Sequence, residues 1–548
     1  MAIHELGKGL PGRRAALFCA LMLFSFAALN PAFAQSGTSG SINGVVKDES
    51  GGALPGATVT LSSPSLQLKQ ITQTTDATGN YQFVDLPLGT YRLKVELSGF
   101  TTSVRDELRL SVGFVARVDV SLKVGAMEET VTVSGQSPVI DVTSTTTSVS
   151  LTAETLNEIP RGRDLAMIYS TAPGVTLAGT PDVGGSNMAN RQNIADGGVG
   201  LQPKLLLEGM NIVLSDDQNS GVYMNNDTLE EIQLKTSGND AEVMVPGVSM
   251  VAVIKSGGND FHGRYGVTDE RPSLQSNNLD DHLRSQGLTA TQPVKTFYDY
   301  AMDLGGRIVK DKLWFYGAYS SQLKKTGITG FVQNAGPDGK FLTGDEPIAY
   351  ATTGIKQFSM KYSYQISKNN RFNYVWQRGT KFVGEDAAGS LSPLEHTRDY
   401  TNPAAIARGE YQATLGASSL LNVVAGYVGW WSDYSAQRQQ QKYGFAFIQP
   451  YTDRITGLTA GASNREFLLR PQDRWMVDAG YSFFPKSFLG GHHEFKTGFT
   501  YYYDHEAWYY PGNTDYGNYI RVFDGTTPVQ IQVANDPVHP SDMEQTYA

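Results

Sequence analysis

The sequence predicts a mainly β protein, with an N-terminal β-sandwich, a mixed α/β domain in the middle and an antiparallel transmembrane sheet in its C-terminal half. Three observations lead to this prediction. The chain begins with an export signal, residues 41–124 contain short β-prone runs separated by turn residues, and from about residue 264 onward aromatic and apolar residues recur at every second position. A period of two is typical of a strand whose two faces meet different surroundings.

Residues 1–34 predict a signal peptide. Three basic residues precede an apolar run at 15–29, and the run ends in the small-residue pattern Pro31-Ala32-Phe33-Ala34. We therefore expect cleavage between Ala34 and Gln35, which removes the run from the mature chain. An uncleaved membrane anchor is the alternative, although the run is shorter than the ~20 apolar residues that a spanning helix needs.

The composition excludes several classes of function. The only cysteine, Cys19, lies in the signal peptide, so the mature chain has neither disulfides nor a cysteine-based metal site. The formal net charge of -10 argues against a nucleic-acid partner, which would need clustered basic residues. After cleavage no apolar stretch is long enough for a transmembrane helix, so a membrane crossing would have to use strands.

Residues 35–124 form the first predicted module. After a small, polar linker, short β-prone runs alternate with turn sequences, and this spacing predicts an antiparallel sandwich. Gly79 suits the left-handed position of a hairpin turn. The side chains predicted to alternate onto the core face are Tyr81, Phe83, Tyr91 and Leu93.

Four sequence motifs of this module carry a family resemblance. They are Gly44-Val45-Val46-Lys47-Asp48, Pro55-Gly56-Ala57-Thr58-Val59, Thr75-Asp76-Ala77-Thr78-Gly79-Asn80-Tyr81-Gln82-Phe83 and Leu88-Gly89-Thr90-Tyr91. Together they resemble the carboxypeptidase regulatory-like domain over nearly the whole module. The resemblance implies a prealbumin-like β-sandwich that binds a ligand or acts as a spacer, rather than a peptidase. This fold is also similar to starch-binding modules, which makes contact with a glycan one hypothesis.

A linker is predicted at residues 125–140, and it contains a short β-prone segment. Its five residues are Glu129, Thr130, Val131, Thr132 and Val133. The segment resembles the TonB box, by which TonB-dependent receptors recruit the periplasmic protein TonB through an added strand. Such pairing needs little more than an exposed, extended backbone. The alternative is a final edge strand or linker of the sandwich.

Residues 141–264 resemble the plug domain of TonB-dependent receptors. The motifs are a short capped helix at 151–160, apolar alternations at 205–211 and 230–236, and the run 250–263, which ends in Lys255-Ser256-Gly257-Gly258-Asn259-Asp260-Phe261-His262-Gly263. This ending is similar to the receptors called Oar-like. Siderophore receptors have a tighter turn where this chain has residues 235–239, so transport of iron chelates is in doubt. The alternative for the segment is an ordinary soluble α/β domain.

Residues 265–548 predict an outer-membrane β-barrel wall. Hairpin turns separate runs in which every second residue is aromatic or apolar. The clearest runs are Phe358, Met360, Tyr362, Tyr364 and Ile366; Phe372, Tyr374 and Trp376; and Trp475, Val477, Ala479, Tyr481 and Phe483. The clusters Trp430-Trp431 and Trp508-Tyr509-Tyr510 suit the aromatic girdles at the membrane surfaces. The alternative is a large soluble β protein.

The predicted wall is incomplete. Receptors of this family close about 22 strands around the plug, whereas the roughly 280 residues after Arg264 suffice for roughly 10 to 12 strands. The last residues, 542–548, read as a polar tail rather than a terminal strand. We therefore expect a truncated barrel, with a smaller complete barrel as the competing interpretation.

No catalytic, cofactor-binding or metal site is predicted. The chain has eight histidines, but neither His492-His493-Glu494 nor His505-Glu506 has the spacing of a metal or catalytic motif. A loop that could cradle phosphate is also missing from the sequence.

The resemblance implies a receptor in the outer membrane of a Gram-negative cell. Its function would be energised uptake of a large or scarce ligand, with TonB and its inner-membrane energising complex as partners. A carbohydrate-derived ligand is a hypothesis, because the sequence does not identify the ligand. The competing function is a non-transporting adhesion or assembly protein that binds glycan or protein through its sandwich and loops.

Overall fold

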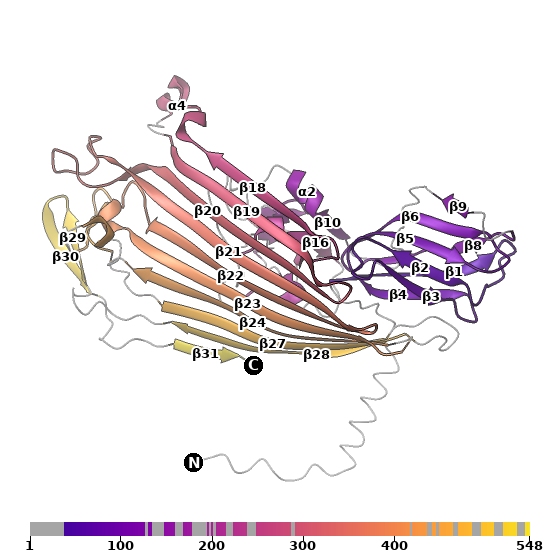
Figure 1. Ribbon diagram of the computed structural model, residues 1–548. Helices are drawn as coiled ribbons and strands as arrows, with labels where there is room; N and C mark the ends of the chain where they lie inside the picture. Colours follow the sequence, from indigo (N-terminus) through magenta and orange to yellow (C-terminus); the bar gives the residue numbers. More distant parts are fainter. Residues whose placement is uncertain are drawn as a thin grey trace, which may run out of the picture.

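The computed structural model shows a mainly β chain built from three parts, as the sequence predicts (Figure 1). It describes residues 38–125, 130–133, 147–158, 168–177, 194–196, 199–200, 204–214, 223–237, 248–286, 291–416, 419–435, 441–444, 449–463, 469–484, 495–508, 519–533 and 543–547. Within these ranges no helix is both long and apolar enough to span a membrane. The predicted signal peptide and the histidine pair at 492–493 lie outside the described residues.

The first part is a sandwich of two sheets. One sheet has the order β4-β1-β7, with β8 also paired to β1, and the other has the order β3-β2-β5-β6-β9. The strands are β1 (Gly40–Asp48), β2 (Thr58–Ser62), β3 (Gln70–Thr74), β4 (Asn80–Leu86), β5 (Gly89–Glu96), β6 (Thr102–Leu110), β7 (Val115–Arg117), β8 (Val120–Leu122) and β9 (Thr130–Val133).

The predicted core and turn of the sandwich are confirmed. Tyr81, Phe83, Tyr91 and Leu93 are all buried between the sheets. Gly79 has a φ of 77°, and a Cβ there would lie 2.6 Å from the Val46 carbonyl oxygen. Only glycine avoids both the strained backbone and the clash at this turn.

The second part is the plug. Its main sheet has the order β10-β16-β17-β14-β15, and a smaller sheet has the order β11-β12-β13. The elements are β10 (Thr147–Thr152), α2 (Ala153–Glu158), β11 (Val175–Leu177), β12 (Ile194–Asp196), β13 (Val199–Gly200), β14 (Lys204–Leu207), β15 (Met210–Asn211), η1 (Asn226–Thr228), β16 (Leu229–Ser237) and β17 (Ser249–Ile254). Thr152 caps α2, because its hydroxyl accepts from the Thr155 amide at 3.3 Å. Every residue of β17 is buried.

The third part is a curved wall of ten antiparallel strands. Its order is β18-β19-β20-β21-β22-β23-β24-β27-β28-β31. The strands are β18 (His262–Glu270), β19 (Val294–Val309), β20 (Leu313–Val332), β21 (Ile348–Ser367), β22 (Asn370–Asp386), β23 (Arg398–Thr414), β24 (Ser419–Ser435), β27 (Leu469–Phe483), β28 (Phe495–Trp508) and β31 (Met543–Tyr547). The sequence predicted a polar tail rather than a strand at 542–548. This prediction is wrong for residues 543–547, which form β31 and pair with β28.

The two ends of the wall differ. The turns after β19, β21 and β23 are short and lie at the end that carries the sandwich (Figure 1). The long connections lie at the opposite end and hold η2 (Pro272–Leu274), α4 (Asp281–Ser285), η3 (Leu394–His396) and a small sheet. That sheet has the order β26-β25-β29-β30, formed by β25 (Tyr451–Asp453), β26 (Thr459–Ala460), β29 (Tyr519–Asp524) and β30 (Thr527–Val533).

The two faces of the wall differ as well. On β21, β22 and β27 exposed apolar residues alternate with buried polar ones. On these strands the exposed set includes Phe358, Tyr364, Phe372, Tyr374, Trp475 and Tyr481, and the buried polar set includes Ser359, Lys361, Asn373, Gln377 and Arg474. The polar residues Arg408 and Gln412 of β23 are buried as well, and Phe499 and Tyr501 of β28 are exposed. Polar residues thus line the concave face around the plug, and apolar residues cover the convex face, as a lipid-facing wall requires.

One aromatic prediction is wrong. Trp430 was expected at a membrane surface, but it is 6% exposed and packs into the plug core. Its indole nitrogen lies 3.3 Å from the Tyr223 hydroxyl of the plug. The sequence pattern fails here because a wall strand also needs large side chains to fill the space between wall and plug.

Candidate functional site

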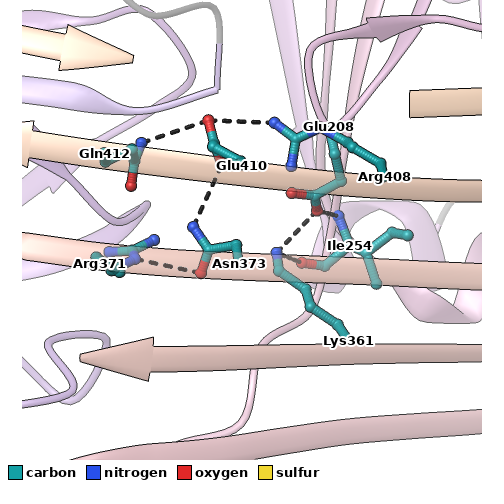
Figure 2. A network of polar contacts seen from close by, with 8 residues as sticks. All are labelled: Glu208, Ile254, Lys361, Arg371, Asn373, Arg408, Glu410 and Gln412. Atoms are coloured by element: carbon teal, nitrogen blue, oxygen red, sulfur yellow. Dashed lines mark hydrogen bonds and ion pairs between the residues drawn. The ribbon is translucent and has the colours of Figure 1, made fainter. Parts of the chain in front are cut away.

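The candidate site is the buried polar interface between plug and wall (Figure 2). At its centre the Lys361 ammonium on β21 lies 2.8 Å from the Glu208 carboxylate of the plug, and both side chains are 6% exposed. Lys361 also donates to the Ile254 carbonyl at 2.9 Å, and the Ile254 amide donates to Glu208 at 2.6 Å. The Glu208 carboxylate therefore links the end of β17 to Lys361 of the wall.

The local sequence explains where Glu208 lies. Glu208 and Gly209 connect β14 to β15, and their φ values are 53° and 78°. Two consecutive left-handed residues make the tight turn that suits a short hairpin. Glutamate is uncommon in this conformation, and here the turn directs its carboxylate toward Lys361. The flanking leucines anchor the hairpin, because Leu205 and Leu207 are buried in the plug core.

A second polar group lies beside the first on β22 and β23. Arg408 lies 3.1 Å from Glu410, whose other oxygen accepts from Asn373 at 3.2 Å. Arg371 in turn donates to Asn373 at 3.3 Å. Figure 2 shows these side chains on the same side of the wall as Lys361. Their spacing of two along each strand directs all of them toward the plug.

Further contacts hold the plug closer to the long connections. Gln377 donates to the Tyr223 carbonyl, and Arg474 donates to the Val213 carbonyl at 2.6 Å. Arg474 also makes a two-bond pair with Asp504 on the neighbouring strand, at 2.5 and 2.6 Å. Such bidentate pairs fix the direction of the guanidinium, and here its third nitrogen, Nη1, points to the plug backbone.

The sandwich docks onto the plug through the chain segment after β6. The Val112 amide donates to Glu231 at 2.9 Å, and Gln233 donates to the Val112 carbonyl at 2.7 Å. Val112 also belongs to an apolar cluster with Leu88 of the sandwich and with Val251 and Val253 of the plug. Both polar groups of one buried backbone position are therefore satisfied by the neighbouring domain, as burial requires.

The sandwich also contacts the wall and the plug–wall junction. Gln412 on β23 donates to Asp85 at 3.0 Å. Asn259, which follows the plug, donates to the Gln67 carbonyl of the sandwich at 2.8 Å. The same Asn259 side chain accepts from the Trp314 indole at 2.9 Å. The sandwich is thus fixed to the plug and to the wall at once.

Asp85 gives this docking a pH dependence. It is partly buried, and burial raises its pKa from the ordinary 3.8 to about 6, with Arg371 opposing and Glu410 adding to the shift. Because the native carboxyl keeps its proton to a higher pH than the unfolded one, the free energy of unfolding falls as pH rises from about 4 to about 6. Asp85 also has a φ of 55°, a conformation that asparagine tolerates.

We therefore expect Asp85→Asn to stabilise the folded protein at pH 7.5 by about 1–3 kcal/mol, allowing for partial exposure of the side chain. Most of this gain should be absent near pH 4, where the native carboxyl is already protonated. Urea unfolding at the two pH values measures the difference. An equal effect of the substitution at both would show that Asp85 is not the titrating group.

The predicted TonB-box segment lies in the sandwich. Residues 130–133 form β9, which pairs in parallel with β6 in the register Thr102↔Thr130 to Arg105↔Val133. Glu129 lies outside the described residues. The described part of the chain contains no group of three or more potential metal ligands.

Sequence reasoning did not single out Glu208, Lys361, Arg408, Glu410 or Asp85. The available signal was the polar residue at every second position of strands whose other positions are aromatic, as at 371 and 373 or at 408, 410 and 412. That pattern identifies the inward face but gives no partner on the plug.

Comparisons with known proteins agree with this architecture. Residues 41–123 match the carboxypeptidase regulatory-like domain. The chain is 26% identical over 422 residues to the TonB-dependent transporter Oar of Myxococcus xanthus, in a match that covers 73% of this chain and 39% of the relative. The chain is similar to an Oar-type TonB-dependent transporter. This Oar-like chain therefore spans well under half the length of its curated relative.

A solved structure shares the fold of the Oar-like chain. The outer membrane transporter YddB from Escherichia coli aligns with a TM-score of 0.52 and 16% identity, over 73% of this chain and 52% of the other. The resemblance to TonB-dependent receptors is confirmed by the match to Oar, and the mainly β fold is confirmed by the match to YddB, which is an outer membrane transporter. Both relatives are named as transporters rather than enzymes.

Proposed function

We propose that this Oar-like chain serves energised uptake of a large or scarce ligand across the outer membrane. The observation that carries the proposal is the plug, which fills the concave face of the wall and is held there by the buried pair of Lys361 and Glu208. A solute can pass such an interface only if the plug moves, and moving it requires work against buried charge contacts.

The two ends of the wall suit different roles in this proposal. The long connections with α4 and the small outer sheet would bind the ligand, since specificity commonly lies in loops on a rigid scaffold (Figure 1). The end with the short turns and the sandwich would face the periplasm. There TonB, driven by its inner-membrane energising complex, would pair with residues 129–133. Covalent chemistry has no part in this mechanism, and a carbohydrate-derived ligand remains a hypothesis.

Replacing residues 129–133 by a glycine-serine segment of equal length tests the proposal. We expect binding of the purified periplasmic domain of TonB to fall at least tenfold, with normal insertion into the outer membrane. Uptake of fluorescent oligosaccharides, measured with and without a protonophore, reports energised transport. A matched glycine-serine replacement of residues 338–342, which are exposed except for the half-buried Phe341, is the control. Unchanged TonB binding in the first variant would remove TonB from the account.

A second function is favoured by one observation. All seven residues of β30 are exposed, and Val529, Ile531 and Val533 are 42%, 62% and 70% exposed at alternate positions. Apolar residues on an exposed strand often mark a protein contact, which suits a surface adhesion or assembly protein. Cell attachment that survives the replacement of residues 129–133 but is lost in Ile531→Lys would favour this function over uptake.

A further inference from the structure

We infer that TonB adds its strand to the outer edge of β9 while β9 stays paired with β6, so that the sandwich as a whole, and not a detached peptide, carries the pull to the plug. This inference rests on the proposed function and specifies how its partner binds. Three features of the sandwich support it.

The first feature is the position of β9 at the edge of its sheet. The sheet order places β6 on one side of β9, and no described strand pairs with the other side. An added strand can therefore bond to β9 without breaking any pair that β9 already makes. The result would be a sheet extended by one strand, which is the usual form of recognition by strand addition.

The second feature is the fixed chain that leads into β9. The Gly125 amide donates to the Gly99 carbonyl at 3.2 Å, and the Thr101 amide donates to the Lys123 carbonyl at 2.8 Å. An isolated bridge joins Phe100 and Val124. These contacts hold the chain before residue 126 against the start of β6. Detaching β9 would therefore leave a segment whose N-terminal side is still fastened to the sandwich.

The third feature is the direct path from β9 to the plug. β9 pairs with residues 102–105 of β6, and β6 ends two residues before Val112. Val112 is 1% exposed, and its amide and carbonyl are held by Glu231 and Gln233 of the plug strand β16. A force applied along β9 would pass to β6 through the backbone pairing of the two strands. From β6 it would reach β16 over about 20 Å of extended chain.

A cysteine lock tests the inference. In the full chain in its outer membrane, Ser103→Cys and Val131→Cys place one thiol on β6 and one on β9 at paired positions. The control pair is Thr60→Cys with Thr72→Cys, on paired strands of the same sheet whose hydroxyls lie 3.3 Å apart. Because the native chain has its only cysteine at position 19, the introduced pairs are the only ones that can form in the sandwich.

We expect the oxidised lock to bind the purified periplasmic domain of TonB within twofold of the reduced protein, as the control pair does. A tenfold loss on oxidation that a reductant restores would overturn the inference, because it would show that β9 must leave β6. Failure of the lock to oxidise while the control pair does would also overturn it. Neither result would affect the proposed function, which fails only if the glycine-serine replacement of residues 129–133 leaves TonB binding unchanged.

A second substitution tests the path to the plug. Gln233→Leu removes the donor to the Val112 carbonyl and lies far along the chain from β9. We expect unchanged TonB binding but at least a fivefold loss of the energy-dependent labelling of a cysteine placed at the buried Ile212 of the plug. Labelling at the native rate would show that the sandwich contact does not transmit the load.

Discussion

Lys361→Met is expected to destabilise the folded protein by about 3–5 kcal/mol, the usual result of leaving a buried charge without its partner. The Glu208 carboxylate is 6% exposed, and in this variant it would lose its ammonium partner and keep the hydrogen bond from the Ile254 amide. The plug should then be held less tightly in the wall. The unfolding midpoint in urea, read from the heat-modifiable band on a gel, measures the loss.

Two variants make this expectation specific. Glu208→Gln combined with Lys361→Met removes both charges while keeping an oxygen for the Ile254 amide, so it should recover most of the lost stability. Lys356→Met changes an exposed lysine of the same strand and should have little effect. A double variant as unstable as Lys361→Met alone would contradict the account, because the cost would then not come from the unpaired carboxylate.

Gly257→Ala is expected to cost about 3 kcal/mol and to reduce the amount of folded protein in the outer membrane. A Cβ at position 257 would lie 2.1 Å from the Phe315 carbonyl oxygen and 2.8 Å from that of Gly306. Both atoms belong to the backbone of paired wall strands, so the strands themselves would have to move. The plug meets the first hairpin of the wall at this point, which explains why glycine is needed there.

The neighbouring glycine provides the matched control. A Cβ at Gly258 meets nothing within 4 Å, so Gly258→Ala should change stability by less than about 0.5 kcal/mol. Each variant adds one methyl group, and the two sites are adjacent in the sequence. Equal effects would mean that the glycine pair serves only as a flexible turn, and the close approach to β19 and β20 would have no energetic role.

The two faces of the wall were predictable from the sequence, because the two-residue alternation along each strand determines which side chains share a face. The alternation of Phe358, Met360, Tyr362 and Tyr364 places these side chains on the convex face without reference to any other part of the chain. The fold of the sandwich was equally accessible, since its turns require glycines and its strands alternate. Trp430 was misplaced, because an inward side chain of a wall strand need not be polar when it fills space against the plug.

The contacts between the parts were not predictable. Lys361 and Glu208 are separated by 153 residues, and no local pattern pairs them. The docking of the sandwich uses the backbone of Val112, which leaves no mark on the side-chain sequence. For residues 129–133 the sequence left two interpretations open, a TonB box and an edge strand. The two agree if a strand at the edge of the sandwich is itself the segment that TonB recognises.

The central claim is that the wall has one face toward lipid and the other toward the plug. Nitroxide labels attached to single cysteines test it most directly, with Phe499 and Tyr501 as outward sites and Ser359 and Ser363 as inward sites. In native membranes the account predicts frequent collisions of oxygen with the outward labels and few with the inward ones, and no contact of the outward labels with a water-soluble nickel chelate. Outward labels that the chelate reaches freely, on a chain that stays monodisperse in buffer without detergent, would contradict the account.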